Sequence, residues 1–388
     1  MNVNLDKKLL AISISALLVD FSAGVLRPVL PILSRNFHAS YALVGFVATA
    51  YGIARLIVDV PLGSIVDTVG RRPLLIGGTI VYIIGTIVGI LATNIYYLVL
   101  FSFIRGLAYA AFFNACYTLV GDISPPDKRA QYMSINLASS FIGISIGSAV
   151  GGEVTQRMGS QSPFILILIV LLGALVFTHF TVDESIDVQQ AKPFELRRLF
   201  EFRNSTVLII YWVSFVTFFT TTSISDVFTS LYSSEVLMLS LAEVGLVITL
   251  DSVSNLCTLT FFGQVSDRLG RKLSIILGLA VFALAASLVM PLGARLFLLI
   301  VVCFGIARGI LSPVIRAVVI DVADFEHRGL ALGVQRIFCD LGGMLGPLML
   351  GIVSDIYGVP SVFVVAAVMC AGTCFVVLLM KRPTTVTQ

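Results

Sequence analysis

Long apolar runs follow one another along almost the whole chain, and short polar segments separate them. Most runs are close to the roughly 20 residues that a helix needs to cross the hydrocarbon core of a bilayer. The runs are continuous and lack the alternation of a membrane β-barrel strand, so they predict helices. The predicted transmembrane helices are twelve, at residues 9–33, 41–66, 74–92, 96–120, 131–156, 163–181, 205–231, 240–265, 273–291, 296–320, 330–356 and 360–380.

The composition agrees with an integral membrane protein. Of the 388 residues, 57% are hydrophobic and only 12% are charged, whereas a soluble domain carries roughly 25% charged residues. So little charge cannot cover the surface of a water-soluble protein of this size. The net charge of +3 gives no indication of a nucleic-acid partner. The first apolar run lacks a small-residue cleavage site, so we expect a retained helix instead of a signal peptide.

Basic residues concentrate in every second connection along the chain. One set of connections contains only Arg35, Arg157 and Arg295. The other set and the termini contain Lys7, Lys8, Arg71, Arg72, Lys128, Arg129, Lys192, Arg197, Arg198, Arg203, Arg268, Arg271, Lys272, Arg328, Lys381 and Arg382. Because the basic side of a membrane protein is cytoplasmic, we expect both termini in the cytoplasm and a multi-pass protein in the plasma membrane. The polar stretch 182–204 is then a cytoplasmic linker between two six-helix bundles, residues 1–181 and 205–388.

The two predicted bundles repeat each other in sequence. Matched glycine, arginine and aspartate positions recur at a nearly constant spacing of 199 to 203 residues. The aligned pairs are Gly45/Gly245, Gly63/Gly263, Asp67/Asp267, Gly70/Gly270, Arg71/Arg271, Arg105/Arg308, Gly143/Gly342, Gly147/Gly346, Gly152/Gly351 and Gly159/Gly358. Two repeated six-helix halves are typical of transporters that hold the substrate near the bilayer midplane and expose it by rocking.

The most specific motif is the loop after the second helix of each half. Residues 63–72 read GSIVDTVGRR, and residues 263–272 read GQVSDRLGRK. Here the chain resembles the major facilitator superfamily, whose signature loop reads GxxxDRxGRR/K, with Thr68 in place of the usual arginine. The resemblance implies an all-α integral membrane fold of two pseudo-symmetric six-helix bundles that works by alternating access. It also implies gating roles for Gly63, Asp67, Gly70, Arg71, Arg72, Asp267 and Arg271, although basic loops also fix the topology of any membrane protein.

Three further features are similar to drug/proton antiporters of this family. Arg105 matches a buried arginine often found in the fourth helix, and Pro28 and Pro31 end the first helix. The fifth helix has the glycine-rich pattern of antiporters from Gly143 to Gly152, with Ser148 where the motif has proline. The alternative is that these glycines serve helix packing alone.

Placing an ionisable residue inside a membrane helix costs free energy, so such residues mark candidate functional sites. The candidates for binding substrate or a proton are Asp20, Arg27, Arg105, Asp226, Asp251 and Arg308. Asp20 and Arg27 are two helical turns apart, and with the two repeated arginines they can form a charged midplane site. The repeat places Leu26 and Tyr51 opposite Asp226 and Asp251, an asymmetry that suits a coupling site. We expect Asp20 to be the main proton-binding group.

A second group of charged residues comes from two helices, the second and the eleventh. Arg55 and Asp59 are four residues apart on the second helix, and Arg336 and Asp340 are four apart on the eleventh. We predict two crossed salt bridges, Asp59 with Arg336 and Arg55 with Asp340, that close the cytoplasmic side. The alternative is that each pair is satisfied within its own helix. Asp321 is expected only to cap or to reach the interface at the end of the tenth helix.

Taken with the resemblance, these residues indicate a secondary active transporter, not an enzyme. There is no nucleotide-binding GxxxxGK[ST] loop and no metal-ligand spacing, so we expect no cofactor. Proton-coupled export of drug-like hydrophobic compounds is favoured by the antiporter-like features. The three arginines Arg27, Arg105 and Arg308 favour the alternative of proton-coupled uptake of an organic anion, and a channel or receptor is the alternative of another class. The expected partners are a small-molecule substrate, protons and lipid, and we expect a monomer.

Overall fold

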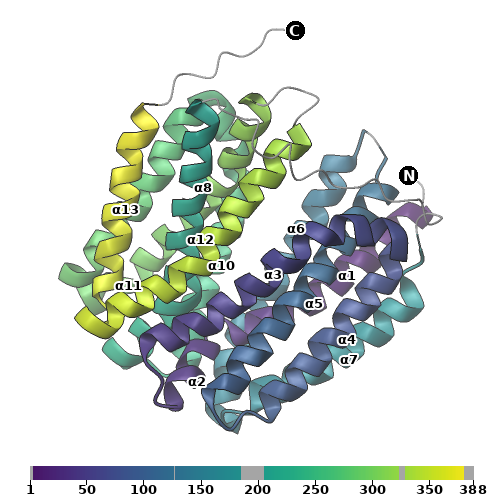
Figure 1. The fold of residues 1–388 in the computed structure, drawn as a ribbon, viewed down its shortest axis with the longest axis horizontal. Helices are drawn as coiled ribbons and strands as arrows, with labels where there is room; N and C mark the ends of the chain where they lie inside the picture. The colour runs from purple at the N-terminus through teal and green to yellow at the C-terminus, as the bar shows by residue number, and fades with distance from the viewer. Residues whose placement is uncertain (1–2, 126, 185–204, 323–327, 380–388) are drawn as a thin grey trace. The chain divides into compact units, whose positions relative to one another are not determined.

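The computed structural model is built from helices along the described part of the chain. It describes residues 3–125, 127–184, 205–322 and 328–379, and of these it describes the backbone alone at 3–6, 60–68, 205, 263–265, 267–268, 294 and 328–330. The helices of the first half are α1 (Val3–Leu26), α2 (Leu30–Asn36), α3 (Tyr41–Val69), α4 (Arg71–Ile90), α5 (Ile95–Ile123), α6 (Arg129–Met158) and α7 (Ser162–Thr181) (Figure 1).

The second half contains two long merged elements. Its helices are α8 (Ser205–Ser223), the π-helix η2 (Ile224–Phe228), α9 (Thr229–Leu231), the π-helix η3 (Tyr232–Val236), α10 (Leu241–Leu269), α11 (Arg271–Val322), α12 (Arg328–Tyr357) and α13 (Ser361–Leu378). Segments α8 to η3 form one span, Thr206–Val236, with π-helical turns in its last third. Element α11 contains two spans because Gly293 leaves the helical conformation, with φ 25° and ψ −125°.

Twelve helices in the described residues are long and apolar enough to cross a membrane, which confirms the predicted number and fold class. The first span has an internal break. Helix α1 ends at Leu26 and α2 begins at Leu30, and Pro28 lies between them. A proline cannot donate a backbone hydrogen bond, and it disfavours helical conformation in the residue before it. The predicted continuous helix 9–33 is therefore divided, and Arg27 lies just beyond the end of α1.

The described residues form two compact units. The first unit holds α1, α2, α3 from Phe46 onward, α4 to α7, and the segment Ser240–Thr249 at the start of α10. The second unit holds Ser40–Gly45, the remainder of α10, and the other helices of the second half. Each unit therefore has the helices of one sequence repeat as its body.

Glycines bring neighbouring helices of each unit into backbone contact. A Cβ atom at Gly147 of α6 would lie 2.2 Å from the backbone oxygen of Phe21 on α1, and one at Gly143 would lie 2.4 Å from that of Leu17. In the second unit a Cβ at Gly342 of α12 would lie 2.3 Å from the backbone oxygen of Phe215 on α8. Small residues at every fourth position let membrane helices approach closely. The glycine-rich segment of α6 thus serves packing, and it fixes α1 against α6 on both sides of Asp20.

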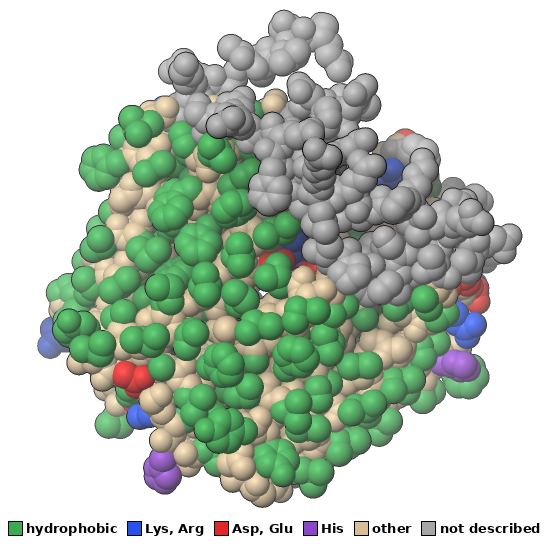
Figure 2. Space-filling view, viewed as in Figure 1, with side chains coloured by type: hydrophobic (Ala, Val, Ile, Leu, Met, Phe, Trp, Pro, Cys, Tyr) green, Lys and Arg blue, Asp and Glu red, His purple; other side chains and the backbone are tan. Residues whose placement is uncertain are grey.

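Apolar side chains dominate the outer surface of the helices. In the described part of the face that Figure 2 shows, hydrophobic side chains are widespread and charged ones are few. Residues such as Ile169 and Val368 are 63% and 66% exposed. Exposed apolar area on this scale is expected for a surface that contacts lipid instead of water.

Candidate functional site

Asp20 lies completely buried in the interior of the first unit, with 0% of its surface exposed. The hydroxyl of Tyr109 on α5 donates a hydrogen bond of 2.8 Å to Asp20 Oδ1. Ser140 on α6 is a near neighbour of the same carboxyl group, yet Asp20 Oδ2 and Ser140 Oγ are both buried without a hydrogen-bond partner. The carboxyl group thus meets hydroxyl groups and apolar side chains.

Arg105, one turn before Tyr109 on α5, lies over aromatic rings. Its guanidinium carbon is 4.6 Å from the ring centroid of Tyr51 and 5.8 Å from that of Phe101. Within the described residues it makes no ion pair, and its Nε is buried without a hydrogen-bond partner. The charged midplane site expected from Asp20, Arg27, Arg105 and Arg308 stays a prediction. The described contacts of the Arg105 guanidinium are with aromatic rings, which attract a cation through their faces.

A second arginine joins this polar interior from α3. Arg55 pairs with Asp59 of the same helix at 3.5 Å, and its guanidinium carbon is 5.7 Å from the centroid of Tyr51. Asn114 of α5 donates to Asp59 Oδ1 at 2.9 Å. Side chains from α3 and α5 thus hold Asp59 inside the first unit.

The second unit holds one tightly bound ion pair. Arg308 of α11 bonds Asp251 of α10 at 2.5 Å between NH1 and Oδ2, and Asp251 is only 1% exposed. Ser225 of η2 donates to Asp251 Oδ1 at 3.4 Å. The half-buried Asp226 lies in η2 beside Ser225, and π-helical turns inside α-helices occur frequently at functional sites. The structure thus joins two of the predicted residues, Asp251 and Arg308.

Arg336 and Asp340 of α12 pair within their own helix, whereas Asp355 of α12 accepts the backbone N–H groups of Tyr41 and Ala42. Arg336 Nε lies 3.0 Å from Asp340 Oδ2, just as Arg55 pairs with Asp59 in α3. These are the pairings that the sequence allowed as an alternative to the crossed salt bridges. The crossed pairs stay a prediction.

The signature loops make the same two contacts in both halves. Arg71 Nε lies 3.1 Å from Asp122 Oδ2 at the end of α5, and Arg271 Nε lies 3.1 Å from Asp321 Oδ2. The second basic residue of each loop bonds the end of the last helix of its half. These bonds join Arg72 NH2 to the carbonyl of His179 at 2.7 Å and Lys272 Nζ to the carbonyl of Leu378 at 2.7 Å.

Asp122 and Asp321 were not predicted as partners of the loops, and Asp321 was expected only to cap or to lie at the interface. Both follow long apolar stretches, and their partners lie about 50 residues earlier. The signal was available in the repeat, because these two aspartates are also 199 residues apart.

Glu184 adds a further contact to the loop of the first unit. Its carboxylate accepts the backbone N–H groups of Arg71 at 3.1 Å and Arg72 at 3.0 Å, so it caps the N-terminus of α4. Gly70, with φ 96°, makes the turn before this helix, and a Cβ atom there would lie 2.7 Å from Glu184 Oε2. Carboxylates stabilise helix N-termini because they satisfy free N–H groups and oppose the helix dipole.

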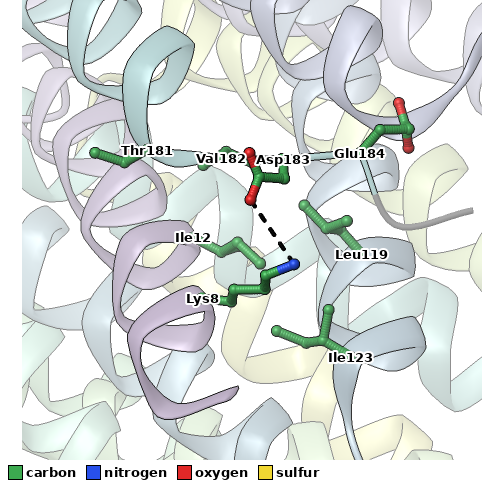
Figure 3. A pocket seen from close by; sticks show the side chains of 8 residues that line it. All are labelled: Lys8, Ile12, Leu119, Ile123, Thr181, Val182, Asp183 and Glu184. Carbon is green, nitrogen blue, oxygen red and sulfur yellow. Dashed lines mark ion pairs between the residues drawn. The ribbon is translucent and has the colours of Figure 1, made fainter. Parts of the chain in front are cut away.

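Figure 3 shows the small hollow beside this cap, where Lys8 of α1 pairs with Asp183 at 3.8 Å. The cavity has a volume of about 10 Å³, which is room for one water molecule. It is too small for an organic ligand.

Three of the predicted gating residues lie outside the described side chains. The helix backbone runs through Gly63, Asp67 and Asp267, but their side chains are not described. Gly70 and Gly270 both adopt positive φ values, 96° and 86°, as the tight turn of the loop requires.

The arrangement of twelve apolar helices, two repeated units and ionisable groups inside each unit defines a multi-pass membrane protein that carries solutes. The family model of the Major Facilitator Superfamily matches residues 12–241 and 212–388, and the chain belongs to this superfamily. Its members are transporters and not enzymes, so the protein is a transporter of small molecules.

Two relatives in sequence cover nearly the full chain. Multidrug resistance protein 2 of Bacillus subtilis (strain 168) is 25% identical over 366 residues, covering 92% of this chain and 91% of its own. Quinolone resistance protein NorA of Staphylococcus aureus (strain MRSA252) is 20% identical over 383 residues, covering 96% and 97%. The crystal structure of the nucleoside transporter NupG superposes with a TM-score of 0.82 at 16% identity, covering 98% of this chain and 99% of that one. This likeness confirms the fold.

Proposed function

We propose that the protein is a proton-coupled secondary transporter that exports drug-like hydrophobic compounds across the plasma membrane by alternating access. The observation that carries the proposal is Asp20, a completely buried carboxyl group without a cationic partner among the described residues. A buried carboxylate is costly when it is charged and unpaired. A proton is the smallest partner that removes this cost, and Asp20 can take up or release one as its surroundings change.

Export is supported by the names of the relatives, which are drug-resistance proteins. The basic loops support cytoplasmic termini, because basic residues remain on the cytoplasmic side. In this proposal the protein works as a monomer in lipid, with the solute and protons as its only small partners. The gating residues of the two signature loops act by making and breaking the contacts of Arg71 and Arg271.

The test begins with the solute. Purified protein is screened by thermal shift against ethidium, a quinolone, sugars, carboxylates and phosphates, and the strongest stabiliser is taken into proteoliposomes. We expect saturable counterflow of that compound, and net flux that follows an imposed pH gradient. A channel would give uncoupled conductance, and a receptor would give binding without flux.

Asp20→Asn tests the coupling residue in the same liposomes. The variant should keep counterflow and lose the dependence on the pH gradient, because an amide cannot carry the proton. Glu153→Gln is the matched control, since Glu153 is a half-exposed carboxylate that pairs with Arg157 far along α6. An unchanged pH dependence in Asp20→Asn rules out the assigned role.

Uptake of an organic anion with protons is the second candidate. It is favoured by Arg105, whose guanidinium makes no ion pair within the described residues. The sign of the pH effect separates the two candidates. Accumulation driven by an acidic interior indicates exchange for protons, whereas accumulation driven by an acidic exterior indicates uptake together with protons.

A further inference from the structure

Arg105 and two residues near it have buried polar atoms without a hydrogen-bond partner. The Nε of Arg105 is buried and unbonded, and so is the hydroxyl of Tyr82 on α4, which is 1% exposed and lies beside the guanidinium. The hydroxyl of Ser102, one turn earlier on α5, is also buried without a partner. Buried polar groups in proteins are almost always hydrogen-bonded. Two unpartnered polar groups on adjoining turns of α5 and a third on α4 therefore indicate a place for an acceptor that comes from outside the chain.

The carboxylates of the first unit do not fill this place. Asp59 is held by Arg55 and Asn114, and Asp20 is held by Tyr109. Arg105 faces the rings of Tyr51 and Phe101 instead. Arg105 itself is only partly buried.

In the second unit the matched arginine has a carboxylate beside it. Arg308 is the repeat mate of Arg105, and Asp251 is the repeat mate of Tyr51. Arg308 bonds Asp251 at 2.5 Å. The two arginines thus occupy matched helices and face matched positions, and only the first lacks an acid.

We infer that Arg105 is the anion-binding residue of the proposed transporter, and that its substrates carry a carboxylate attached to an aromatic ring system. The inference rests on the proposed function and adds the chemical class of the solute. The ligand carboxylate bonds Arg105 as Asp251 bonds Arg308, because a planar guanidinium fits a carboxylate with two parallel hydrogen bonds. Tyr82 donates a further hydrogen bond.

The aromatic part of the ligand follows from the surrounding rings. Tyr51 lies 5.9 Å from Tyr109, and Tyr109 lies 4.2 Å from Phe113, measured between ring centroids. Tyr117 continues this row along α5 at 5.7 Å and is 39% exposed. Aromatic rings prefer offset or edge-to-face contacts with one another at such distances. A row of rings that begins at an unpaired arginine suits a flat ligand with an acidic end.

The experiment compares 2-naphthoate with its neutral isostere 2-naphthamide, by calorimetric titration of the purified full-length protein. Wild-type protein should bind the acid at least about tenfold more tightly, because a hydrogen bond to a charged group contributes more than one between neutral groups. Arg105→Gln should weaken binding of the acid by about 10- to 100-fold and leave binding of the amide nearly unchanged. Arg157→Gln, which removes an exposed arginine of α6, is the matched control and should bind both probes as wild type does.

Two more variants keep the test decisive if Arg105→Gln does not fold. Arg105→Lys keeps the charge but lacks the planar pair of donors, so it should bind the acid with intermediate strength. Tyr51→Asp copies the second unit, because it places a carboxylate against Arg105, and it should abolish the preference for the acid. Equal binding of acid and amide by wild-type protein, or an unchanged preference in both Arg105→Lys and Tyr51→Asp, overturns the inference.

The result separates this inference from the proposed function. Preferential binding of the acid that depends on Arg105, without any proton-driven flux, leaves the anion site standing and removes the proposed transport mechanism. Proton-driven flux of the compound identified in the screen, together with equal binding of acid and amide, supports the transport mechanism and removes the anion site.

Discussion

The interiors of the two repeated units differ at one pair of matched positions. In the second unit Asp251 and Arg308 form a buried ion pair, whereas in the first unit Tyr51 and Arg105 form an arginine–ring contact at 4.6 Å. A glycine near each arginine brings its helix against the backbone of the neighbouring helix, Gly106 against Tyr51 and Gly305 against Asp251. The matched arginines thus meet an aspartate in one unit and a tyrosine ring in the other.

The largest expected effect comes from breaking the ion pair of the second unit. Asp251→Asn leaves the charge of Arg308 uncompensated, and loss of one partner of a buried pair costs about 3–5 kcal/mol. We expect a large fall in the free energy of unfolding, measured by denaturant titration in mixed micelles. Tyr51→Phe, the matched change in the first unit, keeps the ring over Arg105 and should cost far less. Comparable losses in both variants would contradict the asymmetry.

The next largest effect should fall on both units alike. Gly147→Leu forces a side chain against the backbone of Phe21, and Gly346→Leu does the same against Phe219, where a Cβ atom would lie 2.2 Å and 2.4 Å from the carbonyl oxygen. We expect each change to lower stability by about 1–3 kcal/mol or more, as overpacking does, and to lower the melting temperature in detergent. Gly173→Leu is the control, since a Cβ there meets nothing within 4 Å.

The loop ion pairs should differ in strength because they differ in exposure. Arg71 and Asp122 are 8% and 20% exposed, whereas Arg271 and Asp321 are 26% and 41% exposed. Burial reduces screening by water, so Asp122→Asn should cost about 1–2 kcal/mol and Asp321→Asn about 0.2–1 kcal/mol. Unfolding titrations of the two variants at low and high salt test the order. A larger loss in Asp321→Asn would show that exposure does not set the strength.

The smallest expected effect is the loss of the Glu184 cap on α4 of the first unit. Glu184→Gln keeps a side-chain oxygen but removes the charge, so the cap on α4 should weaken by about 0.3–1 kcal/mol. Amide hydrogen exchange at Arg71 and Arg72 should accelerate, because their N–H groups bond this carboxylate. Glu153→Gln should leave the exchange of these two amides unchanged.

The membrane spans could be predicted from the sequence, because the thickness of the bilayer fixes the length of each apolar run. The repeat could be predicted because glycine, arginine and aspartate residues recur at matched positions in both halves. The break after Leu26 was missed, although Pro28 is its cause. The pairs within α3 and α12 follow from a spacing of four residues and were one of two alternatives.

The partners of the loops could not be read from local pattern. Arg71 and Asp122 are brought together only when α4 and α5 pack side by side, and neither apolar run indicates which face of a helix meets which neighbour. The unpaired state of Arg105 was likewise hidden, because the sequence shows a charge but not the rings that surround it. The repeat contained part of this information, since it sets Tyr51 opposite Asp251.

The bonds from Arg72 to the carbonyl of His179 and from Lys272 to that of Leu378 have a mechanical consequence. Each ties the third membrane helix of a half to its sixth, so the last helix cannot peel away from its bundle without breaking a charged hydrogen bond. Force applied at the end of α7 is therefore shared with α4 through two attachments, the bond to Arg72 and the cap by Glu184. With these helices joined at their ends, we expect each bundle to move as a rigid body when its last helix is displaced.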